Sequence, residues 1–102
     1  MACHKLVRDK IPAIIEAQGK SAVFRVLEDV EYTEALENKL DEEVREFHSD
    51  KNLEELADIL EVVYALTENI GATKEQLLEV YEKKHAERGG FLDRIFLLSN
   101  DG

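Results

Sequence analysis

Proline, glycine, cysteine and tryptophan are all scarce in this sequence. The 102 residues include one proline, five glycines, one cysteine and no tryptophan, a composition that suits helices better than sheets joined by many tight turns. Because Cys3 is the single cysteine, a disulfide within the chain is excluded. No apolar run reaches the roughly 20 residues that a membrane span needs, and the start, MACHKLVRDKIP, lacks the apolar region of a signal peptide. We therefore expect a cytoplasmic protein without a membrane partner.

Positive charge is also in short supply. The 13 Lys and Arg residues are outnumbered by 23 Asp and Glu residues, which gives a formal net charge of -10. This charge repels nucleic acids at long range and argues against nucleic-acid binding as the main function. The protein could still bind a small phosphate compound if a divalent cation neutralises the acidic residues around it. Apolar residues make up 44% of the chain, enough for one core, so we expect a single domain over residues 1–102.

Apolar residues recur at helical spacing through most of the chain, which predicts an all-α fold. Asn52 with Glu55, and Thr73 with Gln76, have the spacing of helix-start capping motifs. Residues 22–27 are expected to form either a short strand or an extended connection. The predicted helices cover residues 10–18, 30–49, 53–70 and 74–88.

The predicted helix at 53–70 carries apolar side chains around most of its circumference, and only a narrow polar strip interrupts them. Such a helix must be covered on several sides, and one short chain has little material for this. We therefore expect a four-to-five-helix bundle assembled as a homodimer or homotetramer, with this helix near its centre.

Acidic residues concentrate in the two central helices. Residues 28–61 contain 14 Asp and Glu residues, and such runs are usually solvated helix faces. Glu43 differs, because it interrupts an apolar stripe that begins at Leu36 and ends at Phe47. Glu46 lies one turn further along the same face, close enough to share a cation with Glu43.

The next helix repeats this arrangement with Glu55 and Asp58. Helices joined by a short connection pack antiparallel, so both acidic pairs come to the joined ends and face one small volume. Their mutual repulsion calls for a divalent cation, and hard oxygen ligands select Mg2+, with Mn2+ as a substitute. Both residues also have a purely structural explanation. Glu55 could be the capping partner of Asn52, and Asp58 could belong to the solvated polar strip.

Two acidic motifs and both ends of the chain follow a known family pattern. EEVRE at 42–46 and ELAD at 55–58 match the signature EExxE followed by ExxD, and KLVRDKIP at 5–12 and RGGF at 88–91 are also typical. On these motifs the chain resembles the MazG-like all-α nucleoside triphosphate pyrophosphohydrolases. The resemblance is to the short single-domain branch that is similar to phosphoribosyl-ATP pyrophosphohydrolases, although the gap between the two acidic motifs is shorter than in the longer MazG proteins.

The resemblance implies a homo-oligomeric helical enzyme that hydrolyses a nucleoside triphosphate to monophosphate and pyrophosphate with Mg2+. The metal ligands that it implies are Glu43, Glu46, Glu55 and Asp58. Glu42 is a candidate for orienting the attacking water, and either Glu42 or Glu46 is expected to accept its proton. The expected catalytic residues are therefore Glu42, Glu43 and Glu46.

Basic residues near the two ends of the chain are candidates for holding the substrate phosphates. They are Lys5, Arg8, Lys10, Lys84, Arg88 and Arg94. Lys84 and Arg88 lie one turn apart at the end of a predicted helix, where basic residues also complement the helix dipole without any ligand.

Other functions are compatible with the same residues. The main alternative is a non-catalytic helical oligomerisation module, and another is phosphoribosyl-ATP pyrophosphohydrolase of histidine biosynthesis, because the sequence does not identify the nucleotide. Glu82 and His85 form one Glu-x-x-His pair, which makes di-iron chemistry a minor alternative in the absence of a second pair. A calcium-binding loop at 50–61 is rejected, because its sixth position is Glu55 instead of glycine.

Overall fold

The computed structural model describes residues 4–101, and over this range it contains four helices and no β-strand. Each helix ends within one residue of its predicted range, so the all-α prediction is confirmed. Residues 22–27 form an extended connection, and Cys3 lies outside the described residues. The helices are α1 (Ile11–Ala17), α2 (Asp29–Asp50), α3 (Leu53–Asn69) and α4 (Lys74–Arg88).

Side-chain caps fix where the last two helices begin. The Asn52 side chain accepts a hydrogen bond from the Glu55 backbone N–H at 2.9 Å at the start of α3. At the start of α4 the capping box is complete, since Thr73 and Gln76 each accept a hydrogen bond from the backbone N–H of the other. Lys51 adopts a left-handed conformation with φ of 48° between α2 and α3. The chain therefore reverses direction within two residues, 51 and 52.

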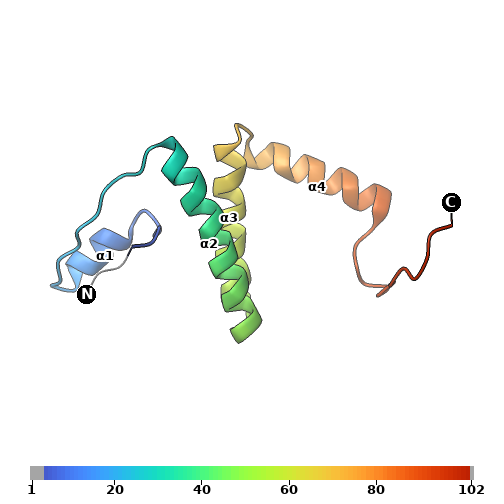
Figure 1. Cartoon of the computed structure of the whole chain (residues 1–102), viewed down its shortest axis with the longest axis horizontal. Coiled ribbons are helices and arrows are strands. Elements are labelled where there is room, and N and C mark those ends of the chain that lie inside the picture. The colour runs from blue at the N-terminus through green and yellow to red at the C-terminus, as the bar shows by residue number, and fades with distance from the viewer. Residues whose placement is uncertain (1–3, 102) are drawn as a thin grey trace.

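Helices α2 and α3 form an antiparallel hairpin at the centre of the molecule (Figure 1). Leu36 of α2 and Val62 of α3 are its buried apolar side chains. Two polar residues are buried with them, Glu43 in α2 and Thr67 in α3. The Thr67 hydroxyl donates a hydrogen bond to the Val63 carbonyl of its own helix at 2.8 Å. Glu43, in contrast, places a carboxylic acid inside the hairpin.

The other two helices extend away from the hairpin on opposite sides (Figure 1). Helix α4 contacts α3, and α1 contacts no other helix of the described chain. The radius of gyration is 18.0 Å, whereas a compact chain of this length has about 13 Å. The exposed area is 9365 Å², against about 5,900 Å² for a compact protein of this mass. A single chain thus does not form a closed helical bundle of the kind that the sequence predicts.

Many apolar side chains are exposed on this open surface. Leu53, Leu56 and Leu60 follow one face of α3 at spacings of three and four residues and are 81%, 45% and 47% exposed. Residues 91–98 add further exposed apolar side chains after α4. No helix among residues 4–101 is long and apolar enough to cross a membrane. Closure of the bundle by further copies of the chain stays a prediction.

Candidate metal centre

Three carboxylates from the two central helices converge where α2 ends and α3 begins. Glu43 of α2 and Glu55 and Asp58 of α3 each offer an oxygen, and these oxygens lie within 4.8 Å of one another. Glu43 is buried, and the other two residues are half-buried. The antiparallel hairpin thus brings together three of the four acids that the sequence predicted as metal ligands. We call Glu43, Glu55 and Asp58 the inner trio.

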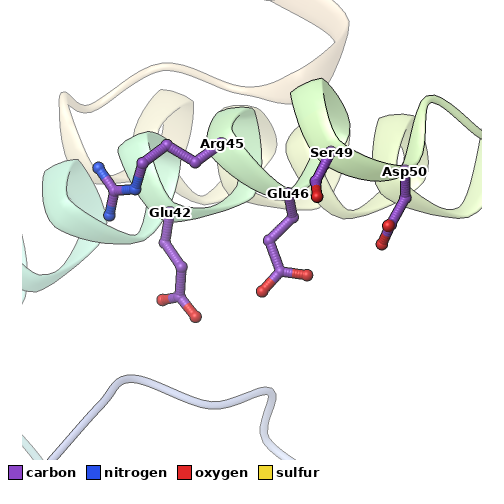
Figure 2. A pocket seen from close by; sticks show the side chains of 5 residues that line it. All are labelled: Glu42, Arg45, Glu46, Ser49 and Asp50. Atoms are coloured by element: carbon purple, nitrogen blue, oxygen red, sulfur yellow. The ribbon is translucent and has the colours of Figure 1, made fainter.

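The fourth predicted ligand, Glu46, belongs to a neighbouring group. Its carboxylate lies within 4.8 Å of Asp50 and Glu55, so that Glu55 is common to both groups. We call Glu46, Asp50 and Glu55 the outer trio. Glu42, Glu46 and Asp50 project to the same side of α2 (Figure 2), where they help to line a shallow depression of about 320 Å³. The predicted quartet is therefore divided between two groups, which share Glu55 and include Asp50 as a fifth acid.

Glu55, which is common to both groups, lies in an unfavourable electrostatic environment. Its Oε2 atom is buried and accepts no hydrogen bond in the described part of the chain. Burial raises the pKa of Glu55 above the ordinary value of 4.5, and the negative charges of Glu46, Asp58, Asp50 and Glu43 raise it further. The side chain does not return a bond to the Asn52 backbone N–H, as a capping box would require. Capping therefore does not explain this carboxylate.

The inner trio fits a small, hard divalent cation. All of its donors are carboxylate oxygens, which Mg2+ and Mn2+ prefer. Oxygens of a six-coordinate Mg2+ lie about 3.0 Å apart when adjacent and about 4.2 Å apart when opposite, so the three oxygens, which lie within 4.8 Å of one another, would draw closer to share one ion. Glu55 Oε2, which has no hydrogen-bond partner among residues 4–101, supplies an oxygen that could bind such a cation.

Lys39 pairs with the two adjacent glutamates of the EExxE motif. Its Nζ lies 3.3 Å from Oε2 of Glu42 and 3.4 Å from Oε1 of Glu43. Glu42 belongs to neither trio. This predicted catalytic residue is instead paired with Lys39 at the edge of the site. Neither Lys39 nor Asp50 was predicted. Both could have been found from helical spacing, because Lys39 lies four residues before Glu43 and Asp50 four residues after Glu46.

One predicted phosphate-binding residue reaches the acidic site. Arg8 places Nη2 at 2.6 Å from Oδ1 of Asp58 and Nη1 at 3.6 Å from Oε1 of Glu61. Lys5 and Lys10 are exposed on the same segment. The polar-strip explanation holds for Asp58 only in part, because this side chain contacts Arg8 and also belongs to the inner trio.

The other predicted basic residues are distant from the acidic site of the same chain. Lys84 and Arg88 lie on α4, and Arg94 lies beyond it. Helix α4 leaves the hairpin at the end opposite the α2–α3 connection (Figure 1). The structure of one chain therefore does not bring these three cations to the carboxylates.

The chain is similar over part of its length to a bacterial protein. No family model matches the chain, and no solved structure matches it. An uncharacterized protein of Mycolicibacterium smegmatis is 53% identical over 45 residues, which are 44% of this chain and 46% of that protein. The match thus spans less than half of the relative's length, and the MazG-like assignment stays a resemblance.

Proposed function

We propose that this protein hydrolyses a nucleoside triphosphate to the monophosphate and pyrophosphate in a Mg2+-dependent reaction. The observation that carries the proposal is the inner trio, in which Glu43, Glu55 and Asp58 converge from two helices within 4.8 Å. Such crowding of carboxylates is costly without a cation, and hard oxygen donors favour Mg2+ or Mn2+. The resemblance to MazG-like pyrophosphohydrolases supplies the reaction and the class of substrate.

The surface of one chain supports a homodimer or homotetramer as the active form. The depression beside Glu46 is shallow, and ligand sites are usually clefts that enclose most of the ligand. A second copy packed on the exposed stripe of α3 would add walls to it. Lys84 and Arg88, which are remote from the acids of their own chain, could then approach the phosphates across the interface. We place this assembly in the cytoplasm.

The chemistry requires a positioned water, charge neutralisation and a stabilised leaving group. A bound Mg2+ ion would neutralise phosphate charge and lower the pKa of a coordinated water. The inner trio would hold the cation, and Arg8 beside Asp58 would reach a phosphate oxygen. The water oxygen attacks the α-phosphorus, the bond to the bridging oxygen breaks, and pyrophosphate leaves.

Glu46 is the better candidate for accepting the proton of the water. It is exposed and makes no ion pair among residues 4–101, whereas Glu42 is paired with Lys39. A carboxylate without a competing cation can turn towards a water molecule at the outer trio. Glu42 would then serve mainly to anchor Lys39.

A nucleotide panel in 18O-labelled water tests the proposal. Canonical, deoxy and damaged triphosphates and phosphoribosyl-ATP are incubated with protein and Mg2+, and products are identified by phosphorus NMR. We expect monophosphate carrying the label, together with unlabelled pyrophosphate. Release of diphosphate and phosphate contradicts the assigned bond. No turnover of any compound favours the non-catalytic oligomerisation module.

A further inference from the structure

Lys39 is a half-buried lysine that contacts two glutamates beside the metal site. Its side chain is 18% exposed, and that of Glu43 is 10% exposed. The ammonium lies 3.3 Å from Glu42 Oε2 and 3.4 Å from Glu43 Oε1. An exposed ion pair at this helical spacing contributes little to stability and does not by itself indicate a function. This pair is different, because Glu43 is buried, and a buried carboxylate is costly unless a cation or a hydrogen-bond donor is paired with it.

The contact links Lys39 to the inner trio. Lys39 Nζ lies 3.4 Å from Glu43 Oε1, and the same Glu43 carboxylate offers an oxygen to the inner trio. Glu42 is adjacent in sequence and contacts the same ammonium, but it lies outside both trios. We infer that Lys39 is a positioning residue, which fixes the Glu43 carboxylate for metal binding and keeps Glu42 out of the inner trio. This inference rests on the proposed function.

Removal of the Lys39 charge should change metal affinity in opposite directions, depending on whether Lys39 positions Glu43 or acts only as a nearby charge. A positive charge near the site repels Mg2+, so its removal alone would tighten metal binding. If Lys39 orients a ligand, its removal frees the Glu43 side chain and weakens binding. Loss of groups that orient metal ligands typically costs 10- to 100-fold in metal affinity. The direction of the change therefore separates the two effects.

The experiment measures the dissociation constants of Mg2+ and Mn2+ by calorimetry, without nucleotide, in the full chain. The variants are Lys39→Gln, Lys39→Met and Lys39→Arg, with circular dichroism as a check on folding. Met has nearly the length of Lys and suits a half-buried position, so it gives a second uncharged variant if Gln disturbs folding. Lys51→Asn is the matched control, because it removes a charge beside the same site and Asn tolerates the left-handed conformation of residue 51.

We expect both uncharged variants to bind metal at least about tenfold more weakly, Lys39→Arg to restore most of the affinity, and Lys51→Asn to bind equally or more tightly. Equal or tighter binding by a folded uncharged variant overturns the role of Lys39 and leaves the proposed function standing. If the unmodified protein binds neither metal, the proposed function fails first, and the role of Lys39 fails with it.

Discussion

Arg8 and Asp58 are separated by 50 positions in the sequence, yet their side chains meet at 2.6 Å. Asp58 is at the same time a member of the inner trio. The segment before α1 is thereby attached to the acidic end of α3, although α1 itself contacts no other helix of the described chain. A guanidinium at this place can pair with a carboxylate or with a phosphate oxygen.

Arg8→Gln is predicted to weaken catalysis and to leave stability almost unchanged. The Arg8–Asp58 pair is 53% and 39% exposed, and such pairs contribute about 0–1 kcal/mol. Loss of a charged contact to phosphate should lower kcat/KM roughly tenfold, mainly through KM. Arg25→Gln is the matched control, because Arg25 also pairs at 2.6 Å with an exposed carboxylate, that of Glu31. Equal kinetic effects of the two variants would refute a role for Arg8.

The raised pKa of Glu55 predicts an unusual pH dependence of the metal-free protein. The unfolded chain ionises Glu55 near 4.5, whereas the folded protein does so only at higher pH. The contribution of Glu55 to the free energy of unfolding is therefore fully present below pH 4.5. It is lost as the pH rises through the pKa of Glu55 in the folded protein. Glu55→Gln should remove this loss.

The measurement compares chemical denaturation of the original protein and Glu55→Gln at several pH values without metal. Subtracting the two curves cancels groups such as Glu31, whose lowered pKa, caused by Arg25, has the opposite effect on stability. With Mg2+ present, stabilisation should instead grow with pH over the same window, because the metal binds the ionised carboxylate. Identical pH profiles of the two proteins would show that Glu55 is not perturbed.

The exposed stripe of α3 predicts self-association. Leu60→Asp should shift the protein from a multiple of 11.7 kDa towards that mass in analytical ultracentrifugation. Burial of one Leu side chain is worth about 1.5–3 kcal/mol, so the dissociation constant should rise at least about tenfold. Glu54→Gln, on the polar side of α3, serves as the control. A monomeric unmodified protein would contradict assembly through this face.

Helix positions could be predicted from the sequence because they depend on local signals. The Asn52 and Thr73 caps and the apolar spacing of α2 and α3 act within a few residues, and each was read correctly. The meeting of Glu43 with Glu55 and Asp58 was also predictable, since a short connection leaves two long helices little choice but to pack antiparallel.

The parts that were missed depend on side-chain rotamers and on distant contacts. The Glu46 carboxylate lies with Asp50 and Glu55 instead of Glu43, and helical spacing alone does not specify such a side-chain conformation. The Arg8–Asp58 contact joins segments that have no shared periodicity. The remoteness of Lys84 from the acids follows from the direction in which α4 leaves α3, which one turn at residues 70–73 determines.

The most direct test of the metal centre is a Mg2+ titration of thermal stability in three proteins: the unmodified chain, Glu43→Gln and Glu37→Gln. Glu37 is an exposed acid on the same helix, outside both trios. At 100 times the dissociation constant, Mg2+ should stabilise the unmodified chain and Glu37→Gln by about 2.7 kcal/mol, which raises Tm by several degrees. Glu43→Gln should show no such shift. A shift of the same size in Glu43→Gln, or none in the unmodified chain, would contradict a metal site formed by the inner trio.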